Sequence, residues 1–142
     1  MKIYVDASFL VSLYGLDANS ASAAEVMRSS AGDRIVTTLG ELEVVNALAL
    51  RVFRKQVSAA QARASVADFE KDLRDEIFHL RALPEQAFDK ARQLSRQTTA
   101  RLGTRTADLL HVAAALELKV DCLYTFDQQQ RKLAHAVHLK VN

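Results

Sequence analysis

The chain has 142 residues, of which 49% are apolar and 25% charged, with four Gly and one Pro. This composition is typical of a compact globular protein and excludes collagen-like, mucin-like and disordered chains. The only cysteine, Cys122, excludes an internal disulfide and a thiolate zinc cage, and its apolar neighbours predict a buried, unreactive thiol. The net charge of +2 does not by itself require a nucleic-acid partner.

Neither a membrane span nor a convincing export signal is present in the sequence. No run approaches the ~18 consecutive apolar residues of a transmembrane helix, so no membrane contact is expected. Residues 7–15 form an apolar run like the core of a signal peptide, but Lys2 is the only basic residue before it. Asp6 and Asp17 also flank this run closely. We therefore expect a cytoplasmic protein.

Apolar runs and turn signals divide the chain into short strands that alternate with helices. Strands are predicted from β-branched and aromatic runs at residues 3–5, 34–37, 77–80, 122–125 and about 137–141. Helices are predicted from periodicity and capping residues at 7–14, 20–29, 38–55, from the cap Ser58 onward, 84–102, 105–118 and 128–134. The apolar stripe of the third helix is predicted to comprise Leu42, Val45, Ala49 and Val52.

This alternation predicts an α/β fold, in which helices cover both faces of a parallel or mostly parallel sheet. No repeat, low-complexity tract or linker divides the chain, so residues 1–142 are predicted to form a single domain. In such sheets the ligand site lies outside the carboxyl ends of the strands. Side chains that follow the strands are therefore the first candidates for chemistry.

Three acidic residues occupy such positions. Asp6 directly follows the first predicted strand, and Asp127 follows the fourth. Each is also a suitable N-cap for the next helix, so a purely structural role for either one stays open. Glu43 lies early in the helix after the second strand, where its helical neighbours Leu39 and Ala47 are apolar. A lone Glu on such a face is either a satisfied buried acid or a site ligand.

A fourth acid, Asp108, opens a helix that is apolar on nearly every side. It is either a site ligand or an acid that stabilises the helix dipole, and His111 has a simple interpretation as a hydrogen-bonded core histidine. Helices that return from the carboxyl edge begin there, so Asp6, Glu43, Asp108 and Asp127 are predicted to converge. Crowded carboxylates repel one another, and a hard divalent cation such as Mg²⁺ or Mn²⁺ relieves that repulsion.

Other catalytic arrangements find little support in the sequence. His135 and His138 are spaced for one helix face but lack a third metal ligand, and an exposed pair is predicted. The chain contains no glycine-rich phosphate loop, no serine elbow and no Cys-His arrangement. Chemistry that depends on a soft metal or on a nucleophilic side chain is therefore not predicted.

The basic residues are unevenly distributed along the chain. Between residues 90 and 107 there are five Lys or Arg residues and no acid, and residues 51–55 carry a second basic cluster. A basic run often forms only a solvated helix face. Beside an acidic metal pocket, it also fits the binding of a phosphodiester backbone, with Arg105 as a phosphate clamp. The residues predicted to bind this backbone are Arg96, Arg101 and Arg105.

In these motifs the chain resembles the PIN-domain ribonucleases, in particular the VapC toxins of bacterial and archaeal toxin–antitoxin pairs. The resemblance spans most of the chain and rests on four segments in order: IYVDAS at 3–8, LEVVNAL at 42–48, TADLLHVAAAL at 106–116 and YTFD at 124–127. Each segment is weakly specific alone, and the four together are quite specific. Thr125 occupies the family's usual hydroxyl position.

The resemblance implies a three-layer α/β/α PIN-like fold with a parallel sheet of about five strands. It also implies a metal-dependent endoribonuclease in which Ser8 and Thr125 orient water. In-line displacement would leave a 5′-phosphate and a 3′-hydroxyl. A homodimer and a small antitoxin that covers the active site are further implications. The residues implied to be catalytic and to bind Mg²⁺ or Mn²⁺ are Asp6, Glu43, Asp108 and Asp127, with Asp6 and Asp108 as the main direct ligands.

Two other functional classes stay open. A receiver-type phosphorylation switch has a similar size and architecture, but it would need a second acid beside Asp6 and a Lys after a late strand, and the sequence shows neither. A catalytically silent RNA-binding or partner-binding module would keep the fold and the basic run without cleaving RNA. The mutual distances of the four acids distinguish such a module from a nuclease.

Overall fold

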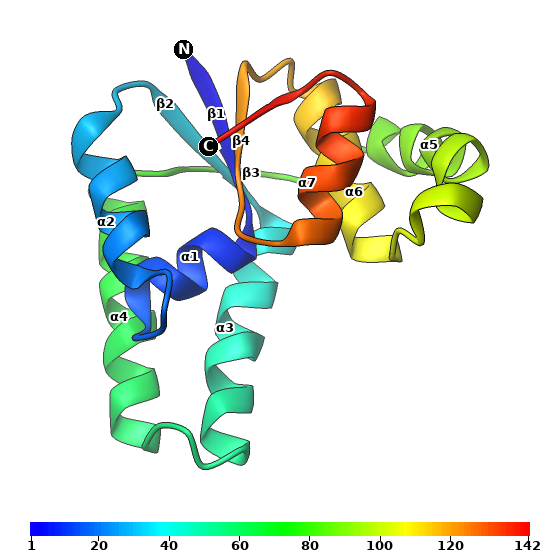
Figure 1. Ribbon diagram of the computed structural model, residues 1–142. Helices are drawn as coiled ribbons and strands as arrows, with labels where there is room; N and C mark the ends of the chain where they lie inside the picture. The colour runs from blue at the N-terminus through cyan, green and yellow to red at the C-terminus, as the bar shows by residue number, and fades with distance from the viewer.

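The computed structural model describes residues 1–142 as five strands and seven helices (Figure 1). The strands are β1 (Lys2–Val5), β2 (Asp33–Thr37), β3 (His79–Arg81), β4 (Cys122–Tyr124) and β5 (Lys140–Val141). The helices are α1 (Ala7–Tyr14), α2 (Ser20–Ser29), α3 (Thr38–Phe53), α4 (Ala59–Arg74), α5 (Gln86–Leu102), α6 (Thr106–Glu117) and α7 (Gln128–Ala136).

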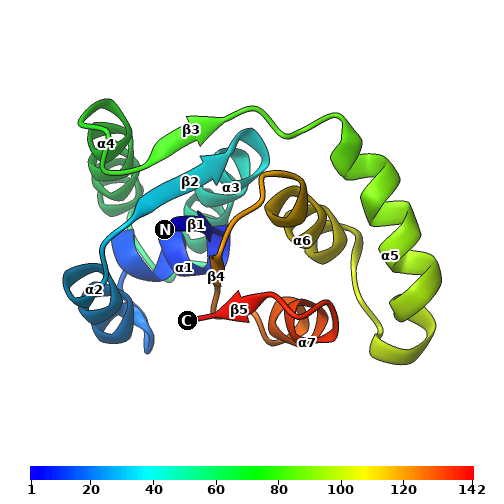
Figure 2. The same ribbon diagram turned by 90° about the horizontal axis from the view of Figure 1, so that it is seen from above.

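All neighbouring strands of the sheet are parallel, in the order β3-β2-β1-β4-β5. Figure 2 shows this order from above, with β1 between β2 and β4. The register pairs Tyr4 of β1 with Ile35 of β2 and with Leu123 of β4. The predicted α/β fold with five parallel strands is confirmed, and the carboxyl ends of the three inner strands meet at one edge.

Side chains of the inner strands alternate between the two faces of the sheet and form two hydrophobic cores. Tyr4 and Leu123 join a core built with α5, α6 and α7. Ile3, Val5 and Tyr124 join the other core, which is built with α1, α2, α3 and α4. Because helices cover both faces, the molecule has the predicted three layers, and the strand ends are left as the place for a site.

Two helix ends form as the sequence predicts. Ser58 caps α4, because its hydroxyl accepts a hydrogen bond from the backbone N of Gln61 at 3.0 Å and the Gln61 side chain accepts one in return at 2.8 Å. Gly103 ends α5 in the left-handed conformation, with φ of 67°. The turn at Gly103 leads directly into Arg105 and α6, so it positions the first turn that carries Asp108.

Two strands differ from the predicted ranges. β3 begins at His79 rather than Ile77, because the backbone N of Ile77 still bonds to the carbonyl of Asp72 at the end of α4. β5 has only two residues, because the backbone N groups of Val137 and His138 still bond to carbonyls of α7. β3 and β5, whose bounds differ from the prediction, lie at the two edges of the sheet, away from the inner strands that the acids follow.

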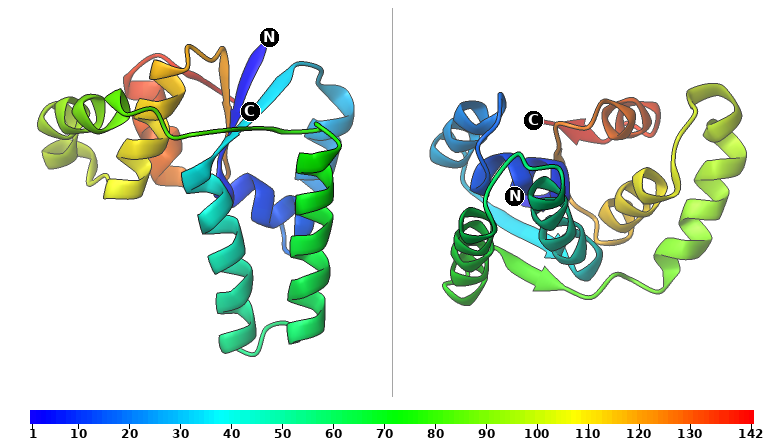
Figure 3. Two further views of the ribbon diagram at one scale, coloured as in Figure 1. Left: turned by 180° about the vertical axis from the view of Figure 1, so that it is seen from behind. Right: turned by 90° about the horizontal axis from the view of Figure 1, so that it is seen from below.

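The core-facing stripe of α3 also differs from the prediction. Val44 and Leu48 are buried, whereas Leu42 is 65% exposed. Figure 3 shows α3 and α4 as a pair that extends away from the sheet. The other three predicted residues line an apolar groove between α3 and α4: Val45, Ala49 and Val52. Periodicity alone could not choose between these stripes, because α3 is apolar on more than one side.

Cys122 is only partly buried at the start of β4, which corrects the prediction of a buried thiol. The burial that it does have raises the pKa of the thiol, so the reactive thiolate is disfavoured. None of the helices is both long enough and apolar enough to cross a bilayer.

Candidate active site

The four predicted acids lie at the carboxyl-end edge of the sheet. Asp6 follows β1, Glu43 lies in the second turn of α3 after β2, and Asp127 follows β4. Asp108 is the third residue of α6. Figure 1 shows that α1, α3, α6 and α7 all begin at this edge. The topology therefore places four acids that are widely separated in the sequence along one edge of the sheet.

Asp6 is completely buried and caps α1. Its Oδ1 accepts hydrogen bonds from Ser8 Oγ at 2.7 Å and from the backbone N of Phe9 at 2.9 Å, and its Oδ2 accepts one from Thr125 Oγ1 at 2.6 Å. Burial raises the pKa of Asp6, an effect that the hydrogen bonds from Thr125, Phe9 and Ser8 oppose. Asp6 therefore caps α1, as the sequence allowed, and it also lies at the edge of the sheet where the site is.

The hydroxyl groups of Ser8 and Thr125 donate to the Asp6 carboxylate, whereas the prediction has them orient water. Each hydroxyl oxygen also accepts a backbone hydrogen bond, Ser8 from Phe126 and Thr125 from Asp127, both at 3.0 Å. These bonds connect the start of α1 to the segment between β4 and α7. They fix the position of Asp6 relative to Asp127.

Arg105 bridges the two acids at the starts of α6 and α7. Its Nε and Nη2 donate to Asp108 at 3.0 and 3.2 Å, and Nη2 also donates to Asp127 at 2.7 Å. The side chain of Asp108 is 2% exposed and that of Arg105 is 64% exposed, so the guanidinium covers the buried carboxylate from the solvent side. Hydrogen bonds to Asp108 and then to Asp127 raise the pKa of Arg105, which therefore stays charged.

His111 is fully buried and connects Glu43 to the first strand. Its Nε2 bonds to Glu43 Oε1, and its Nδ1 lies 2.8 Å from the hydroxyl of Tyr4, which lies 3.0 Å from Thr37 Oγ1. A neutral imidazole protonated at Nε2 satisfies this chain, because it accepts from Tyr4 and donates to Glu43. The predicted hydrogen-bonded core histidine is confirmed, and His111 in addition orients an acid of the site.

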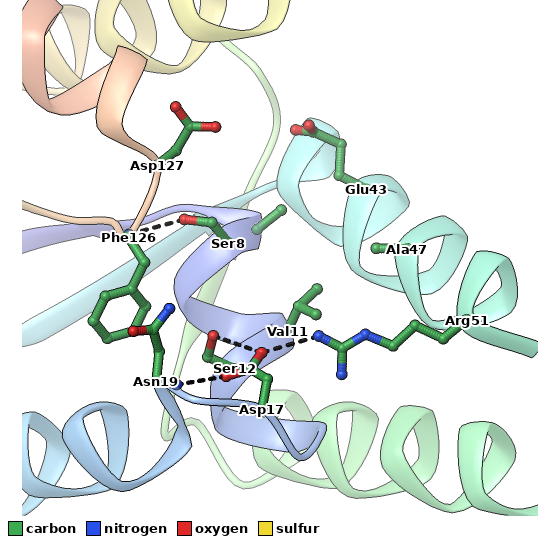
Figure 4. A pocket seen from close by; sticks show the side chains of 11 residues that line it. Ser8, Val11, Ser12, Asp17, Asn19, Glu43, Ala47, Arg51, Phe126 and Asp127 are labelled. Atoms are coloured by element: carbon green, nitrogen blue, oxygen red, sulfur yellow. Dashed lines mark hydrogen bonds and ion pairs between the residues drawn. The ribbon is translucent and has the colours of Figure 1, made fainter. Parts of the chain in front are cut away.

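A cavity of about 410 Å³ opens between Glu43 and Asp127. In Figure 4 these carboxylates face the cavity from α3 and α7, while Arg51 donates to Asp17 at its far end, at 2.9 Å. The volume is within the ~300–1,000 Å³ range of ligand sites. The sequence pattern does not single out Asp17, and it marks Arg51 only as part of a basic cluster.

The donor set at this edge suits a hard divalent cation, because Mg²⁺ and Mn²⁺ prefer carboxylate oxygens. However, no three Asp, Glu, His or Cys side chains lie close enough together to hold one ion. The four acids therefore share one edge of the sheet without forming the tight cluster that was expected. Arg105 joins Asp108 to Asp127, and His111 binds Glu43.

Comparison with known families identifies the fold. The PIN domain family matches residues 3–136, which is nearly the whole chain. The chain belongs to the PIN domain family. Membership confirms the family resemblance of the four sequence motifs and argues against the receiver-type switch. No curated protein matches the sequence of this PIN domain.

Two solved structures share the fold of this PIN domain. VapC20 of Mycobacterium tuberculosis, a toxin that cleaves the sarcin-ricin loop, superposes with a TM-score of 0.71 at 17% sequence identity, over 94% of each chain. VapBC2 of Rickettsia felis, bound to a DNA fragment from its promoter, superposes with a TM-score of 0.68 at 13% identity, over 100% of this chain and 98% of that one. At identities this low, the two superpositions establish a common fold.

The three arginines predicted to bind phosphate differ in their contacts. Arg96 and Arg101 are exposed on α5, and neither forms an ion pair, unlike Arg92, which pairs with Asp89 on the same helix. Arg101 lies in the last turn of α5, close in the chain to the start of α6 at the site edge (Figure 1). Of the three predicted phosphate-binding residues, only Arg105 contacts the acids directly.

Proposed function

We propose that this PIN domain is a metal-dependent endoribonuclease and the toxin of a toxin–antitoxin pair. The main support is the position of four acids along the carboxyl edge of a PIN-family sheet, where Glu43 and Asp127 line a cavity. The similarity to VapC20, a toxin that cleaves the sarcin-ricin loop, supports RNA as the substrate class. An RNA substrate also favours a cytoplasmic location. Residues 1–142 are proposed to act as one catalytic domain.

The residues proposed to hold Mg²⁺ or Mn²⁺ are Asp6, Glu43, Asp108 and Asp127. A divalent cation held there would neutralise charge on the attacked phosphate and would lower the pKa of a bound water. Ser8 and Thr125 fix the Asp6 carboxylate, and His111 fixes Glu43 at the wall of the cavity. We propose in-line attack by water on phosphorus with departure of the 3′ oxygen, which leaves a 5′-phosphate and a 3′-hydroxyl.

A small antitoxin protein is the proposed inhibitory partner, and the similarity to VapBC2 supports it. A homodimer belongs to the same proposal. Large apolar side chains exposed on α3 favour contacts with other proteins, since Phe53 is 83% exposed and Leu42 is 65% exposed.

Cleavage of an unstructured RNA by the purified chain tests the proposal. With Mg²⁺ or Mn²⁺ we expect products that carry a 5′-phosphate, detected by their ligation to an adaptor. EDTA should abolish cleavage, and added Mn²⁺ should restore it. Cleavage that persists in EDTA, or products that end in a 2′,3′-cyclic phosphate, would contradict the proposed mechanism.

A catalytically silent RNA-binding or partner-binding PIN module is the second candidate. The separation of the acids favours it, because no three of them approach closely enough to hold one ion. RNA binding without cleavage in Mg²⁺, in Mn²⁺ and in EDTA would support this module over the nuclease.

Replacing Arg96 and Arg101 with Gln together is expected to weaken RNA binding. Both side chains are exposed and free of ion pairs, so each is able to contact a phosphate and release counterions. The slope of log Kd against log salt should fall by roughly 0.7 unit per lost contact with single-stranded RNA. Arg74→Gln on α4 is the matched control for the loss of one exposed charge. An unchanged slope in the double variant would mean that Arg96 and Arg101 belong to a solvated helix face and do not contact RNA.

A further inference from the structure

The Asp108 carboxylate depends on Arg105 alone for its hydrogen bonds. All three bonds that reach it come from Arg105, from the backbone N, Nε and Nη2. A carboxylate with a 2% exposed side chain needs donors and a counter-cation to offset the loss of water. Arg105 supplies both of them in the metal-free protein.

The same guanidinium reaches an acid from a different segment of the chain. Asp127 Oδ1 caps α7 by accepting from the backbone N of Gln129 at 2.8 Å and of Gln130 at 3.1 Å, which leaves Oδ2 for Arg105 at 2.7 Å. One fixed positive charge thus lies between the acids of α6 and α7. A metal ion shared by these two acids would need the same carboxylate oxygens.

We propose that Arg105 is the built-in counter-cation of the metal-free site and that a divalent cation competes with it for Asp108 and Asp127. This inference rests on the proposed metal site. The two carboxylates and the guanidinium together carry one net negative charge, so a second cation is attracted to them. A divalent ion that replaces the guanidinium neutralises both carboxylates and releases Arg105.

The position of Arg105 in the chain suits such an exchange. Its backbone is extended, with φ of −92° and ψ of 163°, and it precedes the first residue of α6. Its side chain is largely exposed, so it is able to turn outward without disturbing the helix or the core. Once released, the guanidinium is free to bind a phosphate of RNA, for which its planar fork of donors is well matched. Arg105 would then exchange an acidic partner for a phosphate when the metal enters.

Calorimetric titration of Mn²⁺ into the metal-free, full-length protein tests this competition. Arg105→Gln is expected to bind Mn²⁺ about three to ten times more tightly than the parent, since the competing charge is gone. Arg105→Lys keeps the charge but loses the two-pronged contact, so its affinity should lie between the two. Arg74→Gln removes an exposed arginine from α4 and should bind Mn²⁺ as the parent does.

Thermal unfolding provides a second readout that does not depend on RNA cleavage. In EDTA, Arg105→Gln should melt at a lower temperature than the parent, because Asp108 has lost its counter-cation. Saturating Mn²⁺ should then raise the melting temperature of this variant by more than that of the parent. If Arg105→Gln does not fold, the same comparison is made with Arg105→Lys, whose Mn²⁺ affinity must exceed that of the parent.

The outcomes separate this inference from the proposed function. Unchanged or weaker Mn²⁺ binding by Arg105→Gln, with metal-dependent cleavage intact in the parent, would overturn the counter-cation role and leave the nuclease standing. Tighter Mn²⁺ binding by the variant, with no RNA cleavage by the parent, would support the role and count against the nuclease. The absence of Mn²⁺ binding in every protein would overturn both.

Discussion

Asp6→Asn is expected to slow RNA cleavage by about 100-fold or more and to stabilise the metal-free protein near neutral pH. The loss of cleavage follows from the removal of a proposed metal ligand. The gain in stability follows from the surroundings of Asp6, which is fully buried and takes part in none of the ion pairs. Asn keeps an acceptor for the backbone N of Phe9, so the cap on α1 survives.

The stabilisation by Asp6→Asn should depend on pH. Burial raises the pKa of Asp6 in the folded protein above that in the unfolded chain, so the folded state binds more protons between these two values. The parent therefore loses stability as pH rises through this window, and the loss is fully present above it. Below the pKa of the unfolded chain both states are protonated, and parent and variant should have similar stability.

Urea unfolding in EDTA at pH 3 and pH 7, alongside RNA cleavage, measures both effects of this change. We expect a difference in free energy of unfolding of about 1 kcal/mol in favour of Asp6→Asn at pH 7. Asp33→Asn at the exposed start of β2 is the matched control, with no expected effect on cleavage. A variant that cleaves RNA like the parent, or that is less stable at pH 7, would contradict the assignment of Asp6.

The parts of this fold that depend on local chemistry could be predicted from the sequence. Ser58 and Gly103 mark helix ends through their own backbone preferences, and strands 3–5 and 122–125 follow from β-branched and aromatic runs. Once the strands are placed, the parallel topology brings Asp6 and Asp127 to the same edge. Such inferences need only short stretches of chain and the general rules of α/β sheets.

The contacts that tune the acids could not be predicted in this way, because each joins distant segments. Arg105 reaches Asp127 across 22 residues, and His111 reaches Glu43 across 68. A basic residue before an acidic helix start has many possible partners until the helices are placed in space. The basic run therefore indicates phosphate binding, whereas the structure shows that two of its members, Arg92 and Arg105, are already paired with acids.

Asp108→Asn should also abolish cleavage, but with the opposite effect on stability. Like-charge repulsion alone would predict a more stable metal-free protein when one acid is neutralised. Arg105 changes that expectation, because it already pairs with Asp108 and neutralises its charge. Asn loses this ion pair, so we expect the metal-free protein to lose about 0.5–1 kcal/mol, with the high exposure of Arg105 limiting the effect. High salt should reduce the loss, since it screens the pair.

Comparing Asp108→Asn, Arg105→Gln and the double variant isolates the ion pair from the role of Asp108 in the helix. If the pair stabilises the metal-free protein, the double variant should lose less stability than the sum of the two single changes. RNA cleavage in Mg²⁺ is measured on the same proteins, with Asp33→Asn as the control that keeps the site intact. If Asp108 has only a structural role in the first turn of α6, Asp108→Asn should cause a similar small loss of stability and leave cleavage intact. Cleavage therefore decides whether Asp108 is a site residue, and the salt-dependent coupling decides whether Arg105 is its counter-cation.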